Sequence, residues 1–115
     1  MFKLNQNANT SGTHRVGTIH LKPRDIIKAF GFPQNSDGYK VSGEYIFTDE
    51  IGEVFTLYDY KMTSLYDPEY INPVDFWALE TPQEFSIGGN TTPLNFLDWL
   101  ENKVESWRSV RVSVI

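Results

Sequence analysis

The chain of 115 residues contains no cysteine and has only ten lysine and arginine residues, against fifteen aspartate and glutamate residues. The absence of cysteine excludes disulfides, thiolate metal sites and a cysteine nucleophile. The net charge of −5 argues against a protein that binds polymeric nucleic acid, because such proteins need an excess of cations. The apolar runs are only a few residues long, so we expect no membrane span. Residues 1–6 hold no apolar core of signal-peptide length, and we therefore expect a cytoplasmic protein.

We expect one domain over residues 1–115, because a chain of this length has room for one compact core. Aromatic residues make up 15% of the sequence, and their large rings allow a short chain to bury much apolar surface. Residues 5–13 are small and polar, so we expect residues 1–13 to form a mobile N-terminal arm or loop.

Alternating apolar residues predict strands, and apolar residues at helical spacing predict two main helices. Pro23 and Gly31 mark the start and the end of the first helix, and Thr92 is a candidate N-cap for the second. One further helical turn is expected at residues 73–79. The expected helices cover residues 23–30 and 93–105, and the expected strands cover residues 16–21, 39–47, 54–60, 84–87 and 110–115.

Together these elements predict an α+β fold, an antiparallel sheet with two helices packed on one face. The last strand is expected to pair within the domain or across a homo-oligomer, because an exposed edge strand is adhesive. The second helix should pack on the sheet through Phe96, Leu97, Leu100, Val104 and Trp107.

The charges are unevenly distributed along the chain. Residues 1–40 hold six cations against two acids, a balance of +4, and residues 41–115 hold four cations against thirteen acids, a balance of −9. A basic region on an otherwise acidic protein suits a small anionic ligand or a partner of complementary charge. The alternative is that these basic residues form an ordinary solvated helix face.

Two segments are candidates for a ligand site. Gly88 and Gly89 precede a predicted helix, where free backbone amides attract phosphate. The alternative is that these glycines only form a tight strand-to-helix turn. Tyr58 and Tyr60 share one face at the end of a predicted strand and are followed by Lys61, so rings and a cation could hold a nucleobase and its phosphate. Alternatively, the tyrosines are ordinary sheet residues with surface hydroxyls.

The sequence offers no support for catalysis, a metal or a cofactor. His14 and His20 are too far apart along a strand to chelate one metal ion, and there is no third histidine. Asp49, Glu50 and Glu53 are interpreted as hairpin-turn residues, not as paired catalytic carboxylates. The P-loop motif and a nucleophile elbow are both absent. We therefore expect a protein that is not an enzyme.

Several blocks of sequence, taken in order, resemble a family of small uncharacterised proteins encoded by bacteriophages. The family pattern has a Phe-Gly-x-Pro turn, an Asp-Gly-x-Lys strand, a Tyr-Asp-x-Lys strand end and an Ile-Gly-Gly segment before the last helix. These motifs correspond to residues 30–33, 37–40, 58–61 and 87–89 of this sequence. The chain departs from the pattern at Tyr45, where the family often has Trp, and at Phe85 and Ser86, where it often has Trp-His.

This resemblance implies a phage origin and an anti-defence role in the host cytoplasm. Our first hypothesis is that the protein sequesters a small anionic cyclic nucleotide, an immune signal, without cleaving it, as a homo-oligomer whose symmetry matches the ligand. The alternative is a protein-binding inhibitor of a host defence nuclease that acts through an acidic surface. The ligand-binding residues of the first hypothesis offer a cation, an aromatic ring or a free amide, and they are Arg15, Tyr39, Lys40, Tyr58, Tyr60, Lys61, Gly88 and Gly89.

Overall fold

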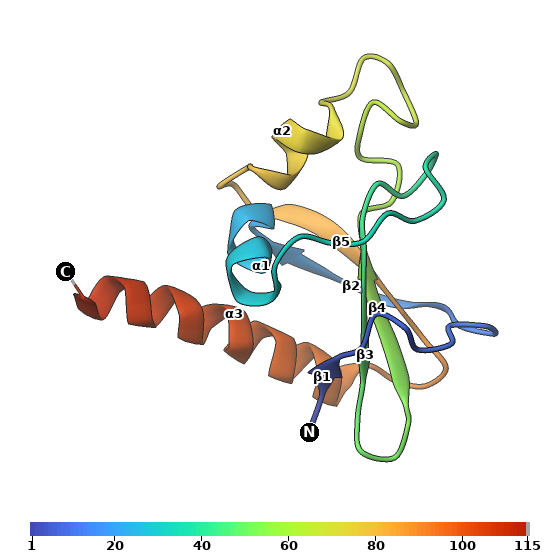
Figure 1. The fold of residues 1–115 in the computed structure, drawn as a ribbon, viewed down its shortest axis with the longest axis vertical. Coiled ribbons are helices and arrows are strands. Elements are labelled where there is room, and N and C mark those ends of the chain that lie inside the picture. The colour runs from blue at the N-terminus through green and yellow to red at the C-terminus, as the bar shows by residue number, and fades with distance from the viewer. Residues whose placement is uncertain (115) are drawn as a thin grey trace.

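The structure, a computed structural model, describes the backbone of residues 1–114 and the side chains of residues 1–105. Figure 1 shows a sheet with helices gathered on one side of it. The strands are β1 (Lys3–Leu4), β2 (His14–Leu21), β3 (Glu44–Thr48), β4 (Val54–Tyr58) and β5 (Gln83–Gly89), and the helices are α1 (Pro23–Phe30), α2 (Pro73–Trp77) and α3 (Leu94–Val114).

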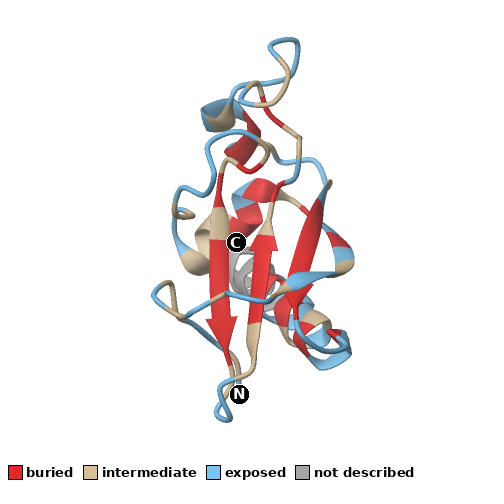
Figure 2. Ribbon diagram, turned by 90° about the vertical axis from the view of Figure 1, so that its right-hand side faces the viewer, coloured by how far each residue is buried: buried red, intermediate tan, exposed pale blue. Residues whose placement is uncertain are grey.

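The five strands form one antiparallel sheet in the order β1-β3-β4-β5-β2. Helices α1 and α3 lie on one face, which confirms the predicted α+β fold (Figure 1). The segment 5–13 links the edge strand β1 to the opposite edge strand β2 and crosses the other face, which Figure 2 shows from the front. We call this second face the open face, and its side chains include Arg15, Glu44, Thr56, Tyr58 and Ser86.

Aromatic rings fill the core between the sheet and its helices, as the composition predicts. The Phe96 ring of α3 stacks on that of Phe55 in β4, with centroids 4.9 Å apart, and lies 5.3 Å from the Phe47 ring in β3. Leu100 and Val104 continue the same fully buried side of α3. Each side chain of this size stabilises the fold by about 1.5–3 kcal/mol when it is fully buried. The predicted contact of Trp107 lies outside the described side chains.

The first helix begins and ends where the sequence predicts. Pro23 occupies the first turn of α1, where its missing amide would have no helical partner. Gly31 follows the last turn with φ = 84°, a backbone conformation that favours glycine. The buried hydroxyl of Tyr45 donates a hydrogen bond of 2.7 Å to the Gly31 carbonyl and so fixes the end of α1 to β3.

The strand predicted for residues 39–47 begins only at Glu44, because two carboxylates take the preceding amides away from the sheet. The Asp37 Oδ1 atom accepts hydrogen bonds of 2.8–3.0 Å from the backbone amides of residues 39, 40 and 41. The Asp59 carboxylate accepts the amides of Ser42 and Gly43. Five consecutive amides are thus bound by side chains, and residues 39–43 form a loop instead of a strand.

The N-terminal residues are attached to the sheet, which corrects the expectation of a detached arm at residues 1–13. Lys3–Leu4 form β1 beside β3, and the Asn5 amide continues the pairing with a 2.7 Å hydrogen bond to the Ile46 carbonyl. The Gln6 side chain then accepts the Ile46 amide at 2.8 Å, in the place of a further strand residue. Phe2 packs into the core, with its ring centroid 5.4 Å from that of Phe96.

The strand expected at residues 110–115 is wrong for residues 110–114, because α3 continues to Val114, and Ile115 lies outside the described residues. No glycine or proline follows Leu94 in this part of the sequence to end the helix. The helix starts with the Pro93 carbonyl, which accepts the Leu97 amide at 2.8 Å, so Pro93 takes the N-cap position expected for Thr92. The helical turn expected at residues 73–79 is α2, and the Asn72 side chain caps it by accepting the Asp75 amide.

Candidate anion-binding site on the open face

The end of β4 is anchored by Asp59, a carboxylate with no exposed surface. Besides the two loop amides, Asp59 accepts a 2.6 Å hydrogen bond from the Ser42 hydroxyl, and the Trp77 indole donates to that same hydroxyl at 3.0 Å. Burial raises the pKa of Asp59, while the hydrogen bonds from Ser42 and Gly43 oppose this shift. Asp59 therefore connects the end of β4 to the loop of residues 37–43 and to α2.

Two residues beyond Asp59, the backbone turns at Lys61 and meets that loop again. Lys61 has φ = 58°, in the left-handed region that residues other than glycine adopt rarely. Its amide donates a 2.6 Å hydrogen bond to the Lys40 carbonyl. The two lysines predicted to bind phosphate are therefore neighbours in space, although twenty-one positions separate them in the sequence.

Two tyrosine rings lie beside the Lys61 ammonium group. Its Nζ atom lies 5.2 Å from the ring centroid of Tyr60 and 5.0 Å from that of Tyr66. Tyr66 in turn contacts Tyr39, with centroids 5.5 Å apart, and the Lys40 Nζ atom lies 5.9 Å from the Tyr39 ring. We call these five residues the tyrosine–lysine cluster. Cation–π contacts of this length stabilise a cation near a ring while leaving it able to bind an anion.

Arg15, Tyr58 and Tyr60 line a hollow of about 260 Å³ beside this cluster. Tyr60 belongs to both features, so the hollow and the cluster are contiguous. Burial raises the pKa of Tyr58, whereas the nearby Arg15 guanidinium opposes this shift. The Tyr58 hydroxyl is therefore a neutral hydrogen-bonding group beside a permanent cation at neutral pH.

A second hollow of about 210 Å³ adjoins the first, because Tyr58 lines both. Thr13 and His14 border it where the segment 5–13 reaches β2, and Glu44 and Thr56 border it from the sheet. Burial raises the pKa of Glu44, and the neighbouring Asp37 carboxylate adds to the shift. The open face therefore combines cations and tyrosines with one half-buried carboxyl group.

The two glycines do not form the loop of free amides that the sequence predicts. Both lie in β5 between β4 and β2, where Gly88 pairs with Thr56 and Arg15. A Cβ atom on Gly88 would lie 2.4 Å from the Thr56 hydroxyl oxygen, and one on Gly89 would lie 2.9 Å from the Phe55 ring. The glycines are therefore required by side-chain packing within the sheet, and their amides do not form a phosphate site at a helix start.

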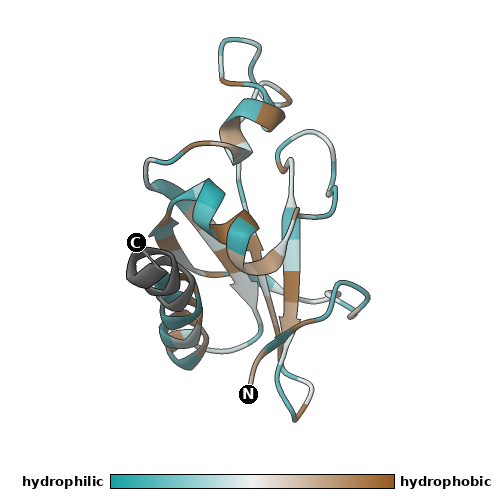
Figure 3. Ribbon diagram, turned by 60° about the vertical axis from the view of Figure 1, so that its left-hand side comes forward, coloured by the Kyte–Doolittle hydropathy of each residue, from teal (hydrophilic) through white to brown (hydrophobic). Residues whose placement is uncertain are grey.

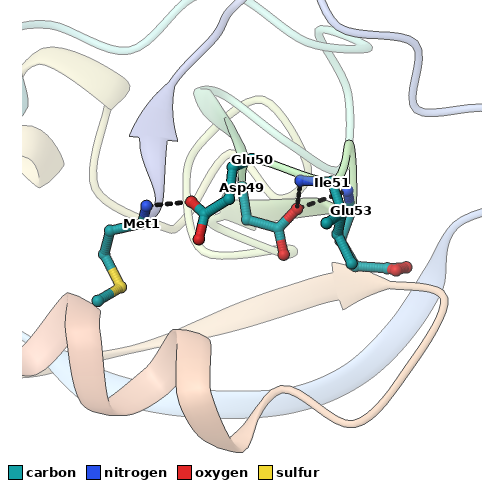
Figure 4. Close-up of polar contacts among 5 residues, drawn as sticks. All are labelled: Met1, Asp49, Glu50, Ile51 and Glu53. Atoms are coloured by element: carbon teal, nitrogen blue, oxygen red, sulfur yellow. Dashed lines mark hydrogen bonds and ion pairs between the residues drawn. The ribbon is translucent and has the colours of Figure 1, made fainter.

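The acids of the β3–β4 hairpin are turn residues, in agreement with their interpretation from the sequence. The Asp49 carboxylate accepts the amides of Ile51 at 3.1 Å and of Glu53 at 2.8 Å (Figure 4). Glu50 pairs with the N-terminal ammonium group of Met1, which lowers the pKa of Glu50. Among the described residues, no group of three or more His, Asp or Glu side chains is placed to hold a metal ion.

Most of the predicted site residues therefore lie in one contiguous region, which extends from the open face into the loops that follow the end of β4 and precede β3. Arg15, Tyr58 and Tyr60 share a hollow, and Tyr60 connects it to the rest of the tyrosine–lysine cluster. Gly88 borders the second hollow, whereas Gly89 faces the core. Sequence reasoning missed Tyr66 and Glu44 as members of this region. The Lys-x-x-x-x-Tyr spacing from Lys61 to Tyr66 has no regular strand period and gave no signal.

No protein-family model matches the chain, and the search of curated proteins finds no significant relative. Within the described residues, no helix is both long enough and apolar enough to cross a membrane.

Proposed function

We propose that this protein binds a small anionic nucleotide on the open face of its sheet and holds it without cleaving it. Following the resemblance to small bacteriophage proteins, the ligand would be a cyclic nucleotide that signals host immunity, sequestered in the host cytoplasm. The observation that carries the proposal is the contiguity of Arg15, Tyr58 and Tyr60 with Lys61 and its second ring, Tyr66.

The chemistry of these groups matches the parts of a nucleotide. Arg15 and Lys61 supply positive charge for phosphate oxygens, and the planar guanidinium of Arg15 can donate two parallel hydrogen bonds. Tyr58 and Tyr60 offer ring faces on which a base can stack, a contact worth about 1–3 kcal/mol per base. The site thus has binding groups for both the charged and the aromatic part of the ligand.

The Glu44 carboxyl group restricts which anionic ligands can bind at the open face. A carboxylate next to the cations opposes the binding of a bare phosphate ion, because like charges repel. The same group can accept hydrogen bonds from the N–H groups of adenine, guanine or cytosine. We therefore expect a nucleotide with an amino-bearing base to bind more tightly than inorganic phosphate.

The size of the hollows favours a site completed by a second copy of the chain. The two adjoining hollows measure about 260 and 210 Å³, and each alone is smaller than the common ligand pocket of about 300–1,000 Å³, so neither encloses a nucleotide by itself. Two protomers facing each other across their open faces would enclose a cyclic dinucleotide between two sets of cations and rings. A two-fold axis through such a site would match the symmetry of the ligand.

A thermal-melting screen with micromolar cyclic dinucleotides and trinucleotides tests the proposal. A ligand that binds only the folded state stabilises it by about 2.7 kcal/mol at about a hundred times its Kd, so a true ligand should raise the melting temperature. Recovery of the unchanged nucleotide by chromatography should show binding without cleavage. If no nucleotide in the screen raises the melting temperature, the proposal is wrong.

Variants assign the site to the open face. Arg15→Ala and Lys61→Ala should each abolish or greatly weaken the stabilisation by nucleotide while the far-ultraviolet circular dichroism stays unchanged. Lys103→Ala, which removes an exposed cation from α3, is the matched control and should bind like the wild type. Unchanged affinity of the Lys61→Ala variant would remove Lys61 from the site.

The alternative function, a nuclease inhibitor with an acidic surface, predicts different results in these experiments. The charge balance of −9 over residues 41–115 favours this alternative, and the cations of the open face argue against it. Such an inhibitor would show no response to nucleotides and would co-purify with a host nuclease. High salt would release the nuclease, because an acidic mimic of nucleic acid binds through charge.

A further inference from the structure

A further cavity lies away from the open face, between α1, the loop of residues 31–35 and α2. It measures about 520 Å³ and opens as a groove whose apolar lining includes Ile27, Phe32, Val74 and Trp77. Figure 3 shows α1 and α2 one above the other on the same side of the sheet. The groove shares no lining residue with the two hollows of the open face, so it is a separate feature.

The groove has a fixed floor and exposed apolar walls. Trp77 is only 6% exposed, and its indole nitrogen is held by the hydrogen bond to Ser42. In contrast, Phe32 and Val74 are 81% and 80% exposed. Large apolar side chains that stand in water on both sides of a formed groove are typical of an interaction surface. The apolar area available to a partner is therefore concentrated at the rim.

The charge of the groove is opposite to that of the whole protein. Its lining includes Arg24 and Lys28 and no aspartate or glutamate, although the chain has a net charge of −5. The two cations are four residues apart on α1 and so lie on the same side of the helix. Neither forms an ion pair with another described residue. A bound group with carboxylates would thus meet two cations at one edge of an apolar groove.

We propose that this groove docks a short segment of a partner protein that carries a bulky apolar side chain flanked by acidic residues. The apolar side chain would pack on Trp77 between Phe32 and Val74, and the carboxylates would pair with Arg24 and Lys28. A small molecule fits less well, because small ligands usually bury about 70–90% of their surface and the walls here are open. Two cations are also too few for a nucleic-acid surface.

Selection from a library of random dodecapeptides against the purified 115-residue chain tests this inference. Enriched peptides should share at least one Phe, Trp or Leu within a few positions of two or more Asp or Glu residues. Their affinity, measured by fluorescence anisotropy, should fall about fivefold or more for Lys28→Glu and for Val74→Asp. Lys103→Glu carries the same charge change on α3 and should bind like the wild type.

Other results would overturn the proposal. No enrichment, a consensus without acids, or equal binding to Lys28→Glu and the wild type would each contradict an acidic segment as occupant. If Val74→Asp instead converts an oligomer into a monomer in sedimentation, the groove is occupied by a second copy of the chain. Circular dichroism and melting of both variants establish that they fold. Lys28→Glu should keep its stabilisation by nucleotide, which separates this test from that of the proposed function.

Discussion

Replacement of Asp59 tests which interactions stabilise the loop of residues 37–43 beside the candidate site. Its carboxylate is fully buried and accepts the Ser42 amide at 3.0 Å, the Gly43 amide at 2.8 Å and the Ser42 hydroxyl at 2.6 Å. We consider two replacements. Asp59→Ala removes every acceptor, whereas Asp59→Asn keeps the size of the side chain and one acceptor oxygen.

The expected losses follow from these contacts. An amide left without an acceptor costs about 1–3 kcal/mol when it is buried, as Gly43 is, and less where water can reach it, as at the half-buried Ser42. The loss of the buried charge returns part of its desolvation cost. We therefore expect Asp59→Ala to lower the free energy of unfolding by about 2–4 kcal/mol. In the Asp59→Asn variant the side-chain oxygen can still accept the Gly43 amide. We therefore expect its free energy of unfolding to fall by only about 1–2 kcal/mol.

Urea denaturation followed by tryptophan fluorescence measures these losses, because Trp77 donates to the Ser42 hydroxyl within the same network. Domains of this size are stable by about 5–15 kcal/mol, so Asp59→Asn should remain folded even if Asp59→Ala does not. Asp67→Asn is the matched control, since Asp67 accepts an exposed amide from Glu69 at 3.0 Å. It should change the free energy of unfolding by less than about 0.5 kcal/mol.

Two results would refute this reasoning. One is an Asp59→Asn variant as stable as the wild type, since the donors of Ser42 and Gly43 would then not depend on a carboxylate. The other is a loss at Asp67 as large as that at Asp59, since burial would then not decide the cost.

The remaining predictions concern packing and pH. Gly89→Ala should lower the free energy of unfolding by about 1–3 kcal/mol, because its methyl group would meet the Phe55 ring at 2.9 Å; unchanged urea stability would show that the sheet relaxes freely. Phe2→Ala should cost about 2–4 kcal/mol in calorimetry, because its ring packs against Phe96; a loss near zero would mean that β1 does not stabilise the fold. Burial raises the pKa of Asp59 above its ordinary value of 3.8, so its contribution to stability declines as the pH rises through the raised pKa. The stability difference between the wild type and Asp59→Asn should therefore be larger near pH 4 than at pH 7 in urea titrations, and a difference that grows toward pH 7 would contradict the shift.

The elements that local patterns determine could be predicted, and those that depend on distant side chains could not. Pro23 and Gly31 bound α1 through their own backbone preferences, so the sequence alone locates this helix. The strand predicted over residues 39–43 fails because Asp59, sixteen positions after Gly43, accepts amides that an alternating pattern assigns to a strand. β1 has only two residues, too short for any periodic signal, and pairing with β3 creates it.

The candidate site divides in the same way. Tyr58 and Tyr60 line one hollow, as the alternation in the sequence predicts, although β4 ends at Tyr58 and Tyr60 lies beyond the strand. Tyr66 joins them only because the chain turns at Lys61, a conformation that no lysine signals in advance. The prediction for the glycine pair is wrong because close packing in a sheet and close approach to a ligand both require a residue without a Cβ atom.

Nuclear magnetic resonance of tyrosine ring signals tests the proposed nucleotide site most directly. Protein labelled with ¹³C at its tyrosines and ¹⁵N at its tryptophan indoles is titrated with each cyclic dinucleotide and trinucleotide of the melting screen. Stacking of a base should shift the ring signals of Tyr58 and Tyr60 and leave the indole signal of Trp77, in the separate groove, unchanged. If no nucleotide shifts these rings, or if the shifts occur at Trp77 instead, the open face is not a nucleotide site.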